Sequence, residues 1–132
     1  DALNATRAAL QEGILPGGGV ALVKISKLLN TNANKKSDQD IAAGMRIVAN
    51  ACVEPFKQIV KNSGKSPDLL LEKVQKSKNN VGYDSRDDKF DDMFELGIVD
   101  PKKVVRCAIE NAASAASIVL SAGSSLIEIS KN

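Results

Sequence analysis

Apolar residues recur every three or four positions along most of the 132-residue chain. This spacing places them on one face of a helix, and proline is favoured at the first position of a helix. Two of the apolar stretches open with a proline, at Pro55 and Pro67. The pattern predicts helical segments near residues 1–12, 18–29, 38–52, 55–61, 67–74, 90–96 and 102–121.

Two stretches depart from the helical pattern. Residues 81–85 begin Val-Gly-Tyr-Asp and favour a short extended segment, and residues 125–130 alternate like a strand after Gly123. A strand at 125–130 has unpaired backbone groups, so we expect another segment or another subunit to pair with it. The predicted fold class is therefore all-α, with a short extended segment near 81–85 and a terminal β-strand near 125–130.

The composition limits the kinds of core and of metal site. The chain is 43% hydrophobic but only 3% aromatic, so aliphatic residues must build the core. It contains no histidine, and its two cysteines, Cys52 and Cys107, lie far apart in sequence. This spacing excludes an ordinary zinc site and favours two buried thiols in a reducing compartment.

The charges argue against two classes of partner. Eighteen basic and sixteen acidic residues leave a formal net charge of +2. This near balance provides no general field for nucleic acid or for an anionic lipid surface. No signal peptide stands out, and we expect no apolar run long enough to span a membrane. We therefore expect neither nucleic acid nor a membrane as a partner.

A proline and three glycines, Pro16-Gly17-Gly18-Gly19, precede the second predicted helix. Glycine accepts positive φ and leaves one side of the backbone free of Cβ atoms. A helix N-terminus carries free N–H groups and a positive dipole end, so this turn is a candidate seat for a phosphate or nucleotide. The alternative is a plain tight connection between two packed helices, because neither common phosphate-loop motif is present.

Three stretches in this order and spacing resemble the C-terminal part of group I chaperonins, the 60-kDa chaperonin family of bacteria, mitochondria and plastids. The first runs from Asp-Ala-Leu-Asn-Ala-Thr-Arg at residue 1 through Glu12-Gly13-Ile14 to the triple glycine and Val20-Ala21-Leu22. The others are Gly82-Tyr83-Asp84 and Gly-Ile-Val-Asp-Pro-Lys-Lys-Val-Val-Arg at 97–106. The resemblance covers essentially the whole chain.

The resemblance implies a domain division and a function. Residues 1–12 would end the intermediate domain, and 13–132 would form the C-terminal half of the helical equatorial domain. The family is an ATP-driven folding machine whose seven-subunit rings enclose non-native polypeptides under a co-chaperonin lid. It implies a location in the cytoplasm for a bacterial protein, and in the mitochondrial matrix or another organelle for a eukaryotic one.

The resemblance also assigns roles to single residues. Asp1 matches the catalytic aspartate that orients the water attacking the γ-phosphate. Gly18, within Gly17–Gly19, matches the glycine against the nucleotide. Asp100 matches the aspartate that hydrogen-bonds the ribose, and Ile98 belongs to the same nucleotide-binding set.

The resemblance places the last three nucleotide-binding residues, Asp84, Ser85 and Arg86, at the edge of the adenine pocket. Ser85 and Arg86 differ from the small or apolar residues usual there. The implied cofactors are ATP, with Mg²⁺ held by the N-terminal half of the family's equatorial domain, and K⁺.

The chain does not begin with Met, and its first residues already follow a helical pattern, so we expect a piece of a longer protein. Phosphoryl transfer needs charge neutralisation, a positioned water and a held nucleoside, and these residues offer only the last two. We therefore predict that the chain alone has no ATPase activity. The alternative function is a small all-α protein-interaction module without nucleotide binding.

Overall fold

A computed structural model describes the backbone of residues 2–131 and the side chains of residues 2–121. The described chain is mainly helical, with four short strands, which confirms the predicted fold class. The elements in chain order are α1 (Ala2–Glu12), β1 (Ile14–Pro16), α2 (Val20–Ala33), α3 (Gln39–Cys52), α4 (Glu54–Asn62), α5 (Pro67–Lys76), β2 (Val81–Asp84), β3 (Lys89–Asp92), β4 (Val99–Pro101) and α6 (Lys102–Lys131).

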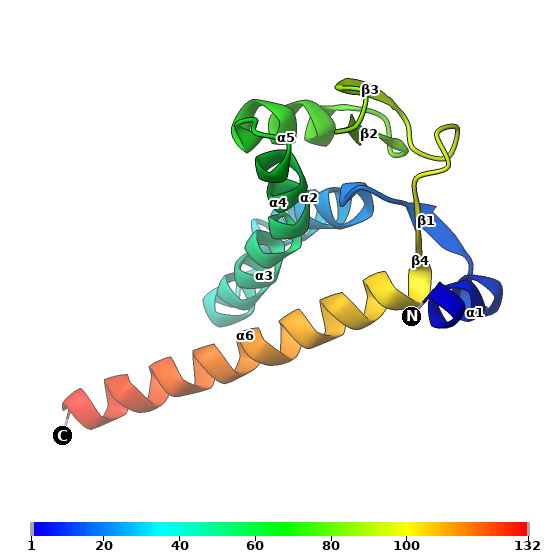
Figure 1. The fold of residues 1–132 in the computed structure, drawn as a ribbon. Helices are drawn as coiled ribbons and strands as arrows, with labels where there is room; N and C mark the ends of the chain where they lie inside the picture. Colours follow the sequence, from blue (N-terminus) through cyan, green and yellow to red (C-terminus); the bar gives the residue numbers. More distant parts are fainter. Residues whose placement is uncertain (1, 132) are drawn as a thin grey trace.

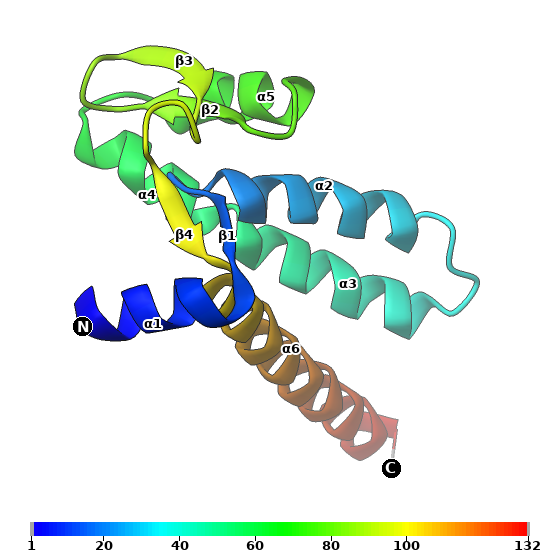
Figure 2. The ribbon, with the colours of Figure 1, turned by 90° about the vertical axis from the view of Figure 1, so that its right-hand side faces the viewer.

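Helices α2 and α3 lie side by side and form the centre of the molecule (Figures 1 and 2). Helix α4 continues from α3 toward α5 and the β2–β3 hairpin, which lie at one end. Helix α6 runs beneath α3, and α1 packs near its first turns. Strands β1 and β4 pair antiparallel between these two regions, with Leu15 opposite Asp100.

The loop between α2 and α3 is shorter than the sequence predicts. Helix α2 continues through Ala33, and the N-cap residue of α3 is Asp38. The Asp38 carboxylate accepts hydrogen bonds from the backbone N–H groups of Asp40 at 2.9 Å and Ile41 at 3.3 Å. An aspartate in this position satisfies N–H groups that have no partner within the helix.

The hairpin of β2 and β3 confirms the extended segment at 81–85 but replaces the helical turn predicted at 90–96. Tyr83 pairs with Phe90 across the hairpin, and their ring centroids lie 5.5 Å apart. The backbone N–H of Met93 then donates to the carbonyl of Asn80 at 2.8 Å, which closes the open end of the hairpin. Contacts between paired strands favour the hairpin over the helix that the short apolar spacing predicts. These contacts involve residues from both strands, so the sequence of one segment does not reveal them.

The predicted terminal strand near 125–130 is wrong, because α6 continues as one helix from Lys102 to Lys131. A helix satisfies its backbone hydrogen bonds within the segment, whereas a strand needs a partner strand. Gly123 lies inside this helix and does not end it. One glycine costs a helix only about 1 kcal/mol, which neighbouring alanines and leucines offset.

Two apolar clusters form the core. The larger joins α2, α4, α5 and the hairpin, and its largest fully buried side chains are Phe56 and Met93. The smaller lies where α3 meets α6, around Val48, Cys52 and Ala116. Since α2 contributes to both clusters, it fixes the hairpin region relative to α6.

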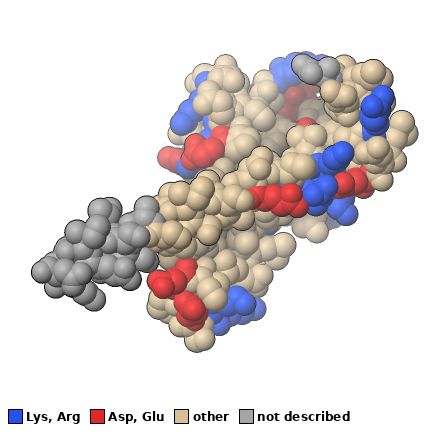
Figure 3. Space-filling view, turned by 90° about the horizontal axis from the view of Figure 1, so that it is seen from below, with Lys and Arg blue, Asp and Glu red and all other residues tan. Residues whose placement is uncertain are grey.

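Much of α6 is apolar and exposed. Figure 3 shows a broad uncharged surface along part of this helix. Ile118 and Val119 of α6 have exposed side chains. Over Lys102–Ser121 the mean hydropathy is 1.3, and 11% of that stretch is buried within the chain. By length and composition it could therefore cross a membrane, contrary to the expectation from sequence. Core helices of soluble proteins meet the same criterion, so length and composition alone do not identify a membrane span.

Candidate functional site

The three glycines form the turn between β1 and the N-terminus of α2, and Gly17 fixes it to the start of β4. The backbone N–H of Gly17 donates to the carbonyl of Ile98 at 2.9 Å. A Cβ added to Gly17 would lie 2.9 Å from the backbone nitrogen of Val99. The two backbone segments therefore approach more closely than any residue with a side chain permits.

The next two glycines turn the chain into α2. Gly18 and Gly19 have φ values of 67° and 79°, in the left-handed region that other residues avoid. A Cβ on Gly19 would stand 2.9 Å from the Cα of Phe56, so α4 packs directly on this backbone. The first N–H groups of α2 have no carbonyl partner inside the helix, and its positive dipole end lies at this turn.

The β2–β3 hairpin lies against the same turn. Gly82 is so close to the side chain of Val20 that a Cβ there would collide with it. Beside the Cβ position of Gly18, the carbonyl oxygen of Tyr83 lies at 3.8 Å and the sulfur of Met93 at 3.6 Å. Two glycine segments distant in sequence thus meet at the first turn of α2.

Asp100 lies in β4, directly opposite Leu15 of β1 and two residues after Ile98. Helix α6 begins two residues later, at Lys102, so Asp100 belongs to the strand before that helix. Its side chain is partly buried, and this burial raises the pKa of the carboxyl above its usual value of 3.8. The pairing of β1 with β4 therefore holds the Asp100 carboxyl near the glycine turn, in a partly buried place that disfavours its ionised form.

The remaining predicted residues lie in the hairpin. Asp84 is buried, and its carboxylate accepts a hydrogen bond from the backbone N–H of Arg86 at 3.0 Å. This bond orders the turn in which Ser85 and Arg86 are exposed to solvent. Asp84 thus shapes the turn, and the next two side chains are free to meet another molecule.

The structure brings together most of the residues that the sequence singled out. Gly17 and Gly18 contact the segment that contains Ile98, and Gly18 also lies beside the carbonyl of Tyr83, the residue before Asp84. Gly19 packs on Phe56 instead, and Asp100 follows Ile98 in β4. Asp1 lies outside the described residues. Within the described part of the chain, no group of three or more histidine, cysteine, aspartate or glutamate side chains could hold a metal ion.

Comparison with known families identifies the fold. Residues 1–124 match the TCP-1/cpn60 chaperonin family. The chain belongs to this family. The resemblance seen in the sequence motifs is thereby confirmed, and the matched region includes every element from α1 to most of α6.

Relatives of this chaperonin chain are found in both sequence and structure. Chaperonin GroEL 3 of Psychromonas ingrahamii is 47% identical over 120 residues, which cover 91% of this chain and 22% of the relative. This match is consistent with the group I branch. The chain therefore spans about a fifth of the length of that relative.

Two solved structures share the fold. A group III chaperonin in the open state has a TM-score of 0.75 and 29% identity, over 86% of this chain and 24% of that one. The open-state monomer of a group II chaperonin from Methanococcoides burtonii has a TM-score of 0.75 and 21% identity, over 86% and 29% of the two chains. The second likeness concerns the fold alone.

Three residues of this chaperonin chain support the glycine turn although the sequence analysis did not select them for the site. Gly82, Phe56 and Met93 pack against Val20, Gly19 and Gly18 respectively. Gly82 was noticed only as part of a motif, and its place inside a strand could have signalled a close backbone approach. Phe56 and Met93 gave no such signal, because the sequence marks them as apolar but does not show which segment each one contacts.

Two grooves of this chaperonin chain lie away from the glycine turn. One, of about 840 Å³, separates α1 from the first turns of α6 and contains Arg7, Lys103 and Cys107. The other, of about 450 Å³, lies between α3 and α6 and is mainly apolar, with Ile41, Met45, Ile109 and Leu120 in its walls. Both grooves are lined by α6, and neither includes a residue of the glycine turn.

Proposed function

We propose that this chain is part of an ATP-dependent chaperonin subunit that encloses and refolds non-native polypeptides. In this proposal the chain supplies the nucleoside side of the nucleotide site and part of the ring-forming domain. Residues 1–12 end the intermediate domain, and 13–132 form the C-terminal half of the equatorial domain. Membership of the chaperonin family supports the general function.

The observation that carries the nucleotide site is the meeting of two glycine segments at the N-terminus of α2. Gly17 hydrogen-bonds to Ile98, and Gly18 lies beside the carbonyl of Tyr83. Gly18 and Gly19 remain partly exposed at the turn, and a helix N-terminus attracts an anionic group. A polar ligand could thus lie along backbone rather than side chains.

In this proposal, a few residues make the contacts with the nucleotide. Gly18 lies against the nucleotide, with Gly17 and Gly19 shaping the turn around it. Asp100 accepts a hydrogen bond from a ribose hydroxyl, a role that suits a partly buried carboxylate because a ligand hydroxyl then replaces lost water. Ile98 offers apolar contact beside it.

Two further parts of the site follow from the family resemblance. Asp84, Ser85 and Arg86 form the edge of the base pocket, where Asp84 orders the turn and the other two side chains remain exposed. Asp1 orients the attacking water. Mg²⁺, held by the N-terminal half of the domain, would neutralise phosphate charge, and K⁺ is proposed as a second cation.

The chain by itself is proposed to be inactive in hydrolysis, because charge neutralisation at the phosphates is assigned to the N-terminal half of the domain. We expect the purified 132-residue chain to show no ATP hydrolysis above background. Turnover that disappears in Asp1→Ala would contradict this division of the site.

A binding experiment on the full-length subunit tests the nucleotide proposal. Asp100→Asn should raise the Kd for ADP in the presence of Mg²⁺ about tenfold or more, since a hydrogen bond to a charged group contributes about 1.5–3 kcal/mol. Asp68→Asn, at an exposed position in the first turn of α5, is the matched control and should leave the Kd unchanged. Equal affinities of Asp100→Asn and the wild type would reject the ribose role.

A second function, a protein-interaction module without nucleotide binding, is favoured by one observation. Val104, Ile118 and Val119 are all more than half exposed along α6. In a ring assembly the same surface would pack against other parts of the subunits. Failure of the full-length wild type to bind ADP at all would favour the interaction module over the nucleotide site.

The partners and the location are proposals at the level of the whole protein. The subunits would assemble into a seven-membered ring closed by a co-chaperonin lid, and membership of the chaperonin family supports self-assembly in general. Electron microscopy of the full-length protein tests the number of subunits. A bacterial source would place the protein in the cytoplasm, and a eukaryotic one in the mitochondrial matrix or another organelle.

A further inference from the structure

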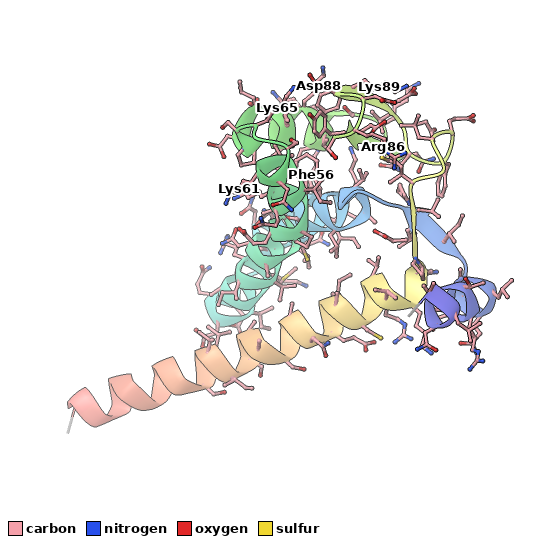
Figure 4. All side chains as sticks on the ribbon, viewed as in Figure 1. Phe56, Lys61, Lys65, Arg86, Asp88 and Lys89 are labelled. Atoms are coloured by element: carbon pink, nitrogen blue, oxygen red, sulfur yellow. The ribbon has the colours of Figure 1, made fainter. Side chains whose placement is uncertain are left out.

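Side chains from two separate turns meet at one oxygen of Asp88. The hydroxyl of Tyr83 donates a hydrogen bond to Asp88 Oδ1 at 2.8 Å, and the ammonium group of Lys65 forms an ion pair with the same oxygen. Lys65 belongs to the turn between α4 and α5, and Asp88 ends the turn between β2 and β3 (Figure 4). We call these three residues the clasp.

The backbone of Asp88 supports a specific role for its carboxylate. Among the described residues, it is the non-glycine residue with positive φ, at 52°. Residues other than glycine adopt this conformation at a cost of about 1–2 kcal/mol, with aspartate and asparagine the best tolerated. The contacts of the carboxylate with Lys65 and Tyr83 give a reason for aspartate at a position where glycine would be easier.

Tyr83 connects the clasp to the glycine turn. Its side chain is only 3% exposed, and its ring packs on Phe90. Its hydroxyl end binds Asp88, whereas its backbone carbonyl lies 3.8 Å from the Cβ position of Gly18. One rigid residue thus spans from the clasp to the turn before α2.

The charges of the clasp reinforce one another. The hydrogen bond from Lys65, followed by that from Tyr83, lowers the pKa of Asp88, and the Asp88 carboxylate raises the pKa of Lys65. The lysine nitrogen also lies 6.0 Å from the centre of the Tyr83 ring. Because Lys65 and Asp88 are partly exposed, each contact is weak in isolation, and the joint geometry sets the position of the turn.

We propose that Lys65 is a positioning residue for the nucleoside side of the site, because through Asp88 and Tyr83 it holds the β2–β3 turn against the glycine turn. This inference rests on the proposed nucleotide function. The turn carries Ser85 and Arg86, so loosening it should weaken contacts with the base and leave contacts with the phosphates unchanged. The α4–α5 turn thereby becomes part of what determines nucleotide affinity.

The test compares two probes on the full-length subunit by isothermal titration in the presence of Mg²⁺: ADP, and inorganic tripolyphosphate, which has no base. Lys65→Met keeps the length of the side chain and removes its charge. We expect this variant to raise the Kd for ADP about fivefold, the scale of one charged surface contact, and to leave that for tripolyphosphate within about twofold.

Three further variants serve as controls. Lys65→Arg restores a cation and should recover the affinity for ADP. Asp88→Asn removes the ion pair from the other side and should reproduce the effect of Lys65→Met, so the test stands even if one variant folds poorly. Lys61→Met, at an exposed lysine of α4 near Lys65 (Figure 4), should bind both probes like the wild type.

The outcomes separate this inference from the proposed function. If the wild type binds ADP but Lys65→Met binds it equally well, the clasp has no positioning role and the nucleotide site stands. If Lys65→Met weakens both probes equally, its charge acts on the phosphates in general, which also overturns the inference. If the wild type binds neither probe, the proposed function fails and the inference fails with it.

Discussion

The guanidinium group of Arg106 forms a two-pronged ion pair with the carboxylate of Glu12, with N···O distances of 2.7 Å and 3.3 Å. Arg106 lies in the second turn of α6, and Glu12 is the last residue of α1. A second carboxylate, that of Glu110, binds the same guanidinium at 2.9 Å. The pair ties α1 to α6 beside Gly13, whose φ of 93° marks the change of direction into β1.

This pair predicts a pH-dependent contribution to stability. The hydrogen bond from Arg106 holds the pKa of Glu12 below its usual value of 4.5. Its stabilising contribution is therefore present above pH 4.5 and is lost as the pH falls through the lower pKa of the folded state. Glu12→Gln should lower the midpoint of urea unfolding at pH 7 and have little effect at pH 3.

Glu95→Gln, at an exposed position in the turn before β4, is the control for this pH comparison. A Glu12→Gln midpoint that differs from the wild type equally at both pH values would show that the pair contributes by packing and not by charge. High salt should reduce the difference at pH 7, because the pair is exposed.

Three glycine-to-alanine variants separate the two constraints on the glycine turn. Gly17 has a close backbone neighbour, Gly64 has φ of 81° with open space around it, and Gly19 combines both conditions. We expect Gly64→Ala to lower the free energy of unfolding by about 1–2 kcal/mol and Gly17→Ala by about 1–3 kcal/mol. Gly19→Ala should lower it by about 2–5 kcal/mol, and urea unfolding followed by circular dichroism measures all three. If Gly19→Ala lowers the free energy of unfolding no more than Gly64→Ala does, Phe56 can shift to accommodate the added methyl group.

The cap of α3 gives a prediction that separates two adjacent residues. Asp38→Ala removes the acceptor for two N–H groups and should lower the free energy of unfolding by about 1 kcal/mol. Ser37→Ala should change it by less than about 0.5 kcal/mol, because the serine precedes the cap. The reverse order of effects in thermal unfolding would show that Ser37, and not Asp38, stabilises the start of α3.

Asp100 should show opposite effects on stability and on binding. Burial raises its pKa above 3.8, so the folded state binds its proton more tightly than the unfolded state does. The folded state therefore loses stability relative to the unfolded state as the pH rises from about 3.8 through the higher pKa. Asp100→Asn should match or exceed the stability of the wild type at pH 7, and this advantage should disappear at pH 3.

Urea unfolding at the two pH values, alongside the ADP titration, checks this prediction. Lower stability of Asp100→Asn at pH 7 would mean that the ionised carboxylate has favourable partners in the folded protein. Greater stability with weaker ADP binding would mark Asp100 as a residue kept for function at the expense of stability.

The sequence predicted helix positions well where a proline or glycine marks the start or end of the helix. Pro55 and Pro67 mark the starts of α4 and α5, and the stretch before Gly13 forms α1. The prediction from sequence was wrong at 90–96, where pairing with β2 makes a strand, and at 125–130, where helix α6 continues. Both errors concern short apolar patterns that suit either structure, so distant partners or their absence decide the outcome.

By itself, the sequence determined the helical class, the family resemblance and the presence of a glycine turn before α2, because these depend on composition and on the order of residues. Only the tertiary structure decided what meets at that turn. It brought Tyr83 and Ile98 beside Gly18 and Gly17, and joined Lys65 to Asp88. Contacts of this kind depend on how α2, α4 and the hairpin pack together, and no local spacing of residues encodes that packing.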